Sequence, residues 1–313
     1  MGSSRTRRSV MHIDCERLVN GGRLDWSADE DRRNSPNALR ILVGFGRGCV
    51  LYGQALAATI VIPLRGRVQL SDGEQVRTLV NGELLVCESG QRVQAIGRGA
   101  ALWIAVFTES GVWHQLTGDV PESAPDPLLV PALHTADRPL RRAAVRLARI
   151  ALAVDRKDTA LTLTAASAFA TLISDLQAEF DPLIARCPGR TLAQRRSVFL
   201  RLQRVRNYLV ANCHLEVDND RLARMASYSP WHFIRAFRAA YLQTPHAFLV
   251  EQRLQRACRL LRSSPLAVAE IALASGFENR CAFSRLFRQR FGITAGALRR
   301  RVEPVTLPCA SLV

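Results

Sequence analysis

Residues Leu222 to Pro245 read LARMASYSPWHFIRAFRAAYLQTP, and residues Ile271 to Ala295 read IALASGFENRCAFSRLFRQRFGITA. A shift of fifty residues aligns phenylalanines, arginines and a threonine of the two stretches, as Phe233/Phe283, Phe237/Phe287, Arg235/Arg285, Arg238/Arg288 and Thr244/Thr294. Self-similarity of this kind indicates one supersecondary unit that the chain uses twice. Each copy predicts a short helix, a polar turn and a second helix that carries arginine.

The ends of the helices in the first copy can be predicted from local chemistry. Asp218 is placed to cap a short helix that runs through Met225. Ser229 and Pro230 begin the next helix, because a serine side chain accepts a free amide hydrogen bond and proline has no amide to lose. On that helix Phe233 and Phe237 are four residues apart and are expected to face the core.

The outward positions of the two arginine-bearing helices are the candidate contacts to double-stranded DNA. They are Trp231, Ile234, Arg235 and Arg238 on the first helix, and Arg280, Cys281, Ser284, Arg285 and Arg288 on the second. A helix in the major groove reads base edges mainly through its N-terminal residues, and arginine forks onto guanine. The alternatives are a solvated arginine face, half-buried packing for Trp231, and a redox role for Cys281 in place of contact with a thymine methyl.

A third helix, from His246 to Arg262, is predicted between the two copies, with Leu249, Leu254, Ala257 and Leu260-Leu261 along one face. About 17 residues at ~1.5 Å each give roughly 26 Å. Together with the bodies of the two units, this helix can hold the recognition helices near the ~34 Å that separates successive major grooves.

The charge of the chain is concentrated in the same region. The formal net charge is +16, and residues 191–303 hold 20 Arg against 7 Asp and Glu. A basic surplus in the part of the chain that contains the repeat indicates a polyanionic partner.

The cysteines and histidines predict neither a metal site nor a bound cofactor. The eight cysteines are scattered without a C-x-x-C pair, which is typical of reduced thiols in a cytoplasmic protein. No apolar run approaches the ~18 residues that a membrane span needs, so no membrane partner is expected.

The N-terminal half predicts an antiparallel β-barrel or sandwich. Its short apolar runs are separated by turn residues and cover 39–45, 59–64, 68–70, 84–87 and 101–107. A proline-rich stretch, Pro121 to Pro139, follows as a linker. Trp103, Trp113, Arg65 and Arg67 could line a pocket, or could be core tryptophans and surface arginines.

Helices are predicted from Asp137 to Ala153, from Thr159 to Ala185 and from about Leu192 to Asn212. The first two either pack on the barrel or form a dimer seam, because both arrangements bury an apolar stripe. The expected organisation is therefore an α+β multidomain chain: a barrel at 1–120, a helical dimerisation or connecting segment at 137–187, and an all-α DNA-binding domain with two helix-turn-helix units at 195–303.

From about Arg195 to Arg301 the sequence resembles the AraC/XylS transcription regulators. The matching elements include Ser229-Pro230-x-x-Phe233-x-Arg235-x-Phe237-Arg238, Arg253-Leu254-x-x-Ala257-x-x-Leu260-Leu261, Gly276-Phe277 and Phe283-Ser284-Arg285-x-Phe287-Arg288. By this resemblance Trp231, Ile234 and Arg235 read bases in the first unit, and Arg280, Cys281 and Arg285 do so in the second. Leu242, Ala295 and Leu298 depart from the family pattern, which has glycine, proline and an aromatic residue there.

The resemblance also implies a cupin-like N-terminal barrel that senses a small-molecule effector or mediates homodimerisation. The implied function is a transcription regulator, more often an activator, that binds DNA and contacts RNA polymerase. The alternatives are a non-sensory scaffold for protein interaction and a metal-dependent cupin enzyme. His12, His114 and His134 are far apart in the sequence, which argues against the enzyme.

Overall fold

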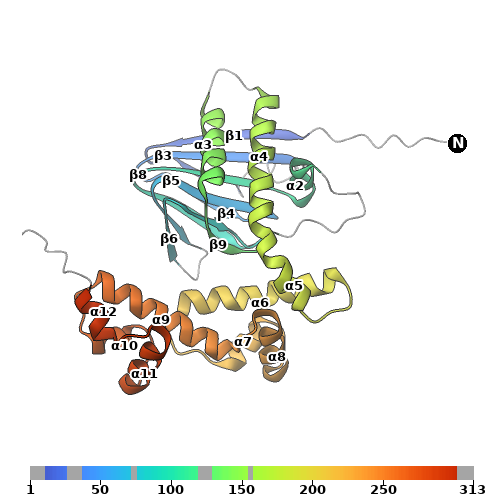
Figure 1. Ribbon diagram of the computed structural model, residues 1–313. Coiled ribbons are helices and arrows are strands. Elements are labelled where there is room, and N and C mark those ends of the chain that lie inside the picture. The colour runs from blue at the N-terminus through green and yellow to red at the C-terminus, as the bar shows by residue number, and fades with distance from the viewer. Residues whose placement is uncertain (1–10, 27–36, 72–75, 119–128, 154–157, 302–313) are drawn as a thin grey trace, which may run out of the picture. The chain divides into compact units, whose positions relative to one another are not determined.

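A computed structural model describes residues 11–26, 37–71, 76–118, 129–153 and 158–301. The chain divides into two compact units, Met1–Ile184 and Ala185–Val313, called below the N-terminal and the C-terminal unit. The N-terminal unit combines a sheet with helices, and the described part of the C-terminal unit is helical (Figure 1). The predicted combination of an N-terminal sheet and a C-terminal helical domain is confirmed. Part of the proline-rich stretch, residues 119–128, lies outside the described residues.

The strands described in the N-terminal unit all belong to one sheet. They are β1 (His12–Val19), β2 (Arg23–Asp25), β3 (Ala38–Gly46), β4 (Val50–Gln54), β5 (Ala58–Ser71), β6 (Val76–Val80), β7 (Glu83–Val86), β8 (Arg92–Thr108) and β9 (Ala132–Thr135). The hydrogen-bonded order β1-β3-β8-β5-β7-β9 has two ends, while β4 also pairs with β8, β2 with β4, and β6 with β5. The sheet is therefore not closed, and the predicted cupin-like barrel is not confirmed.

The predicted antiparallel pairing is wrong for the strands β1 and β2. Strand β1 pairs with β3 in parallel, from His12 opposite Ala38 to Val19 opposite Phe45, and β2 pairs with β4 in parallel. Each of these strands skips its neighbour in the sequence to reach its partner. The long strands β5 and β8 are antiparallel, as expected for strands joined through hairpins.

Helices α3 (Arg138–Leu152) and α4 (Thr159–Gln177) lie side by side on one face of the sheet (Figure 1). The stripe Leu140, Ala144 and Leu147 is buried and packs with Phe169 of α4 against strand residues such as Ile41. The shorter helix α2 (Ser110–Thr117) contacts α4. Of the two arrangements that the sequence allowed, the structure shows packing on the sheet within one chain.

Among the described residues, one helical stretch, Thr159–Arg186, is long and apolar enough to cross a membrane by length and composition. The core helix of a globular protein passes the same test. Here Ala165, Phe169 and Ile173 are buried in the core beneath the helix, which accounts for their apolar character.

The opposite face of the sheet has its own core, which includes Trp103, Trp26 and Phe107. Trp103 is fully buried and fits only because residue 44 is glycine: a Cβ there would lie 2.2 Å from the indole ring. Trp113 is also buried, whereas Arg65 and Arg67 are exposed. These tryptophans are core residues, and these arginines are surface residues.

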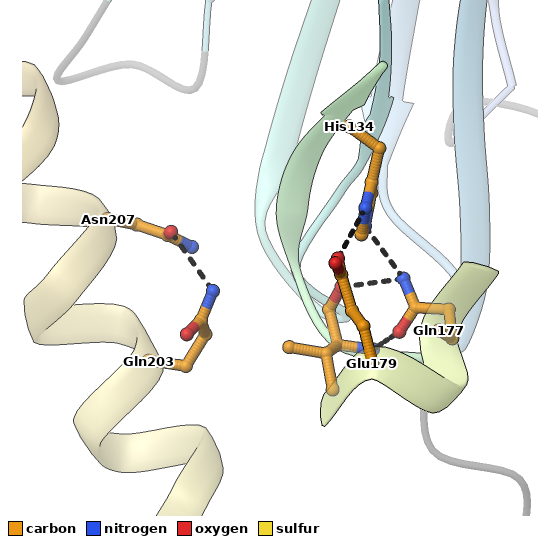
Figure 2. Close-up of polar contacts among 6 residues, drawn as sticks. His134, Gln177, Glu179, Gln203 and Asn207 are labelled. Carbon is orange, nitrogen blue, oxygen red and sulfur yellow. Dashed lines mark hydrogen bonds and ion pairs between the residues drawn. The ribbon is translucent and has the colours of Figure 1, made fainter. Parts of the chain in front are cut away.

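The helix predicted from Thr159 to Ala185 is interrupted. Helix α4 ends at Gln177, the 3-10 turn η1 (Ala178–Phe180) follows, and α5 (Asp181–Arg186) begins anew. The Gln177 side chain accepts from the Val130 amide at 2.7 Å and lies 3.0 Å from His134 Nε2, while His134 Nδ1 lies 3.0 Å from Glu179 Oε1 (Figure 2). These contacts fix the end of α4 to strand β9, so the break is stabilised by partners far away in the sequence.

The C-terminal unit continues with seven helices in the described residues. They are α6 (Leu192–Asn212), α7 (Asn219–Met225), α8 (Pro230–Tyr241), α9 (Pro245–Ser263), α10 (Val268–Ala274), α11 (Arg280–Phe291) and α12 (Ala295–Arg301). Helix α6 has the bounds that its periodicity predicted, and Thr191 caps it by accepting from the Gln194 amide. Helices α7 and α8 form the first repeated unit, α10 and α11 form the second, and α9 joins them.

Candidate nucleic-acid interface

The two copies of the repeat have similar aromatic cores. In the first, the ring centroids of Phe233 and Phe237 are 5.8 Å apart, and those of Phe237 and Tyr241 are 4.7 Å apart. In the second, Phe283 and Phe287 are 5.4 Å apart. All four phenylalanines are fully buried, as predicted from their spacing. Burial of this inner face leaves the opposite face of α8 and of α11 exposed.

The helices of the first unit begin at the predicted residues, but one predicted capping contact is not formed. Asp218 caps α7 by accepting from the amides of Asp220 and Arg221. Helix α8 begins at Pro230, with Ser229 as its N-cap residue. The expected hydrogen bond from an amide to the Ser229 side chain is absent, because its hydroxyl lies 2.7 Å from His232 Nδ1 and pairs with that ring.

The predicted outward residues of α8 are all exposed. Trp231 is 62% exposed and Ile234 is 37% exposed, so Trp231 is not a packing residue here. Arg235 and Arg238 are exposed as well. The Arg235 guanidinium lies 5.3 Å from the centroid of the Trp231 ring, in a cation–π contact that orients both side chains.

The outward residues of α11 are also exposed, namely Arg280, Cys281, Ser284, Arg285 and Arg288. The start of this helix is fixed by Asn279, whose side chain accepts from the amides of Cys281 and Ala282 at 2.8 and 3.1 Å. This cap was not predicted, although asparagine just before a helix is a recognised signal. The cap leaves the N-terminal turn of α11 ordered and open to solvent.

Arg253 of α9 connects the linking helix to the end of α6. Its Nε donates to the Cys213 carbonyl oxygen at 2.7 Å, and its Nη2 donates to the Leu215 carbonyl oxygen at 2.9 Å. Burial lowers the pKa of this guanidinium below its ordinary value. We call this set of contacts the Arg253 clasp. The sequence motif that contains Arg253 did not predict this role.

Other arginines of the C-terminal unit also stabilise the fold. Arg256 donates to the Ala274 carbonyl oxygen at 3.0 Å, and Arg299 donates to that of Ser264 at 2.8 Å. Arg290 pairs with Glu251 at 2.7 Å, and its hydrogen bond lowers the pKa of the Glu251 carboxyl. Some arginines of this unit therefore form internal contacts, and others lie on the outward faces of α8 and α11.

The described residues contain no group of three or more His, Cys, Asp or Glu placed to hold a metal ion. The seven cysteines within them, all except Cys309, form no disulfide bonds. Burial raises the pKa of the Cys187 thiol to about 11, which makes this thiol unreactive near neutral pH.

A family profile described as "Helix-turn-helix domain" matches residues 222–301. The HTH-type transcriptional regulator GlxA of Rhizobium meliloti is 43% identical over 89 residues, which are 27% of this chain and 26% of GlxA. The regulatory protein SoxS of Escherichia coli is 32% identical over 83 residues, which are 26% of this chain and 78% of SoxS. The chain belongs to the AraC family of transcription regulators.

The matched residues of the family profile, 222–301, lie within the C-terminal unit. A solved structure, the DNA-binding domain of AdpA in complex with a target DNA, is 32% identical and covers 32% of this chain and 91% of that one, with a TM-score of 0.31. The chain spans less than two fifths of the length of the curated relatives with the strongest matches.

Three departures from the AraC-family pattern are visible in the structure. Leu242 follows α8 with a φ of 58°, where the family has glycine and where the second unit has Gly292 with a φ of 72°. A leucine in this left-handed region is strained. Ala295 is buried at the start of α12, and Leu298 packs against the core of the second unit. Ala295 and Leu298 therefore affect packing in the second unit, whereas Leu242 affects the turn that ends α8.

Proposed function

We propose that this AraC-family chain is a sequence-specific DNA-binding transcription regulator in which α8 and α11 enter neighbouring major grooves of one duplex. The observation that carries the proposal is the duplicated, exposed, arginine-bearing face at the N-terminal half of both helices. On this proposal the DNA contacts are Trp231, Ile234, Arg235 and Arg238 on α8, and Arg280, Cys281, Ser284, Arg285 and Arg288 on α11.

The linking helix supports this arrangement. Helix α9 has 19 residues, which at ~1.5 Å each gives about 28 Å. The bodies of the two units extend this span toward the ~34 Å groove repeat. A rigid helix favours binding at both grooves, because less freedom is lost on docking than with a flexible connection.

The test begins with genome-wide footprinting of the full chain to find its sites. Arg285→Ala is then expected to weaken binding to such a site by roughly 1–3 kcal/mol and to relax the preference at one base position. Arg262→Ala removes another exposed arginine, at the end of α9, and is the matched control that should leave base preference unchanged. If Arg285→Ala weakened binding equally on every base variant of the site, Arg285 would be a phosphate contact. If the full chain preferred no site over random competitor DNA, the proposed function would be overturned.

The proposed binding also has an ionic component. Several arginines would neutralise phosphates, so the affinity should fall steeply and log-linearly with salt concentration. An activating role through contact with RNA polymerase is part of the proposal. Transcription in vitro from a footprinted promoter, with and without the protein, decides between activation and repression.

We further propose that the N-terminal unit senses an effector or joins two copies of the chain in a cytoplasmic homodimer. The segments proposed for these roles are 1–120 and 137–187, with 195–303 as the DNA-binding domain. Leu161 and Leu163 of α4 are 42% and 36% exposed, which supports pairing through this helix. Sedimentation equilibrium of the full chain and of Leu161→Glu tests the dimer: a monomeric parent protein overturns it.

A further inference from the structure

A groove of about 680 Å³ lies in the C-terminal unit between α6 and α8. The lining residues of α6 and of α8 recur at intervals of three and four, so one face of each helix lines the groove. Its volume is within the ~300–1,000 Å³ of ordinary ligand pockets. None of the roles described above uses this groove as a whole.

The floor of the groove is apolar and made of small side chains. Val198 of α6 and Ala236 of α8 line it from buried positions, and Ser197 and Ala239 line it from exposed ones. Helices normally fill the space between them with large interdigitating side chains. Here residues of this size leave the groove open, and the apolar floor favours a ligand with an apolar body.

The rim of the groove is cationic. Arg186, Arg201 and Arg235 line it, and none of its lining residues is an Asp or a Glu. A planar guanidinium pairs with a carboxylate, sulfonate or phosphate through two parallel hydrogen bonds. Three such groups without a lining acid provide charge complementarity to an anion.

Two of these arginines are already oriented in the structure. Arg201 lies 4.8 Å from the centroid of the Tyr228 ring and donates to the Tyr228 hydroxyl oxygen at 3.3 Å. Arg235 lies over the Trp231 ring. Oriented side chains lose less freedom when a ligand binds, which increases affinity.

We propose that the groove binds a small organic anion whose apolar body lies on the α6–α8 floor and whose anionic head pairs with Arg201 and Arg235. The ligand would also weaken DNA binding by occupying Arg235; this second part rests on the proposed function. The anion site itself does not depend on it.

The probe for the site is naphthalene-2-carboxylate, titrated calorimetrically into the full chain without DNA. Naphthalene-2-methanol, which has the same ring and a neutral head, and acetate, which has the head without the ring, are the matched ligands. We expect one binding site for the naphthoate and at least tenfold weaker binding for both matched ligands. Equal binding of the alcohol, or no naphthoate binding at millimolar concentration, would overturn the site.

Three variants localise the binding. Arg201→Gln removes a cation from the rim, and Ala239→Leu fills the groove from an exposed position that leaves the core intact. Both should weaken naphthoate binding at least tenfold, with unchanged far-UV circular dichroism. Arg238→Gln is the control, because Arg238 is an exposed α8 arginine that does not line the groove. Equal affinity for all three variants places the binding elsewhere and overturns the proposal.

The competition is measured separately on a footprinted DNA site. Saturating naphthoate should raise the Kd for that DNA at least threefold in the parent protein, and it should have no such effect in Ala239→Leu. Naphthoate binding that depends on the groove but leaves the DNA affinity unchanged would overturn the competition alone. A chain that binds no DNA specifically would overturn the proposed function, while the calorimetry still tests the anion site.

Discussion

Gly276 lies in the turn between α10 and α11, and adding one methyl group there should destabilise the C-terminal unit strongly. Its φ is +88°, a left-handed conformation that side chains other than glycine rarely adopt. A Cβ there would lie 2.9 Å from the Cys213 carbonyl oxygen, 2.9 Å from Arg253 Nε and 3.0 Å from His214 Cα. Gly276→Ala must therefore strain the turn and displace the Arg253 clasp.

The magnitude follows from three contributions. The left-handed backbone costs an alanine about 1–2 kcal/mol, and a lost hydrogen bond to a charged group costs about 1.5–3 kcal/mol. Alanine offsets about 0.4–1 kcal/mol of this by restricting the unfolded chain. The expected loss of unfolding free energy is about 2–4 kcal/mol. Gly292→Ala is the matched control, since its φ is +72° and nothing lies within 4 Å of its Cβ position. It should cost only about 1 kcal/mol, because the cost of the left-handed backbone is partly offset by the restricted unfolded chain and no hydrogen bond is lost.

The assay is urea titration of the full chain, with hydrogen exchange of peptides from α6 and α9 followed by mass spectrometry. Exchange resolves the stability of the C-terminal unit from that of the rest of the chain. Gly276→Ala should increase exchange at the end of α6 and in α9, whereas Gly292→Ala should leave α6 unchanged. If both variants lost the same unfolding free energy, the crowding around Gly276 and the Arg253 clasp would contribute nothing to stability, and the reasoning would be refuted.

Three further predictions concern the same unit. Leu242→Gly should raise its unfolding free energy by up to about 1 kcal/mol, because it relieves a left-handed leucine that is 69% exposed; a lower urea midpoint would contradict this. Tyr241→Phe should cost about 0.5–1.5 kcal/mol in the same titration, since it removes the hydroxyl that donates to Gln203 Oε1 at 2.8 Å. Glu251→Gln removes the carboxyl whose pKa is lowered by the hydrogen bond with Arg290. The stability that Glu251 contributes is present above its ordinary pKa of 4.5, and it is lost as the pH falls through the lower pKa of the folded state. Urea midpoints of parent and variant should therefore differ near pH 7 and converge in acid; a difference independent of pH would exclude this linkage.

Local signals explain why the helical unit could be predicted closely. Asp218 and Pro230 begin their helices through contacts within one turn, and the phenylalanine spacing of four residues defines the buried face of α8 and α11. Such signals depend on neighbours in the sequence, so they can be recognised before the fold is known. The prediction for the Ser229 side chain was wrong even at this short range, because His232 competes for its hydroxyl.

Pairing in the sheet depends on distant residues. The alternation of apolar runs and turns predicted strands in the N-terminal half, but it carried no information that β1 passes over β2 to join β3 in parallel. The break after Gln177 is of the same kind, since Val130 and His134 bind that side chain from more than forty residues away.

The sequence by itself determined the duplicated helical unit, its buried phenylalanines and its outward arginines, because periodicity and helix caps act over a few residues. Only the tertiary structure decided which arginines hold the fold together, which strands pair, and that α6 and α8 leave a cationic groove between them. Those properties arise where remote segments meet, and their geometry depends on packing that no short stretch of sequence encodes.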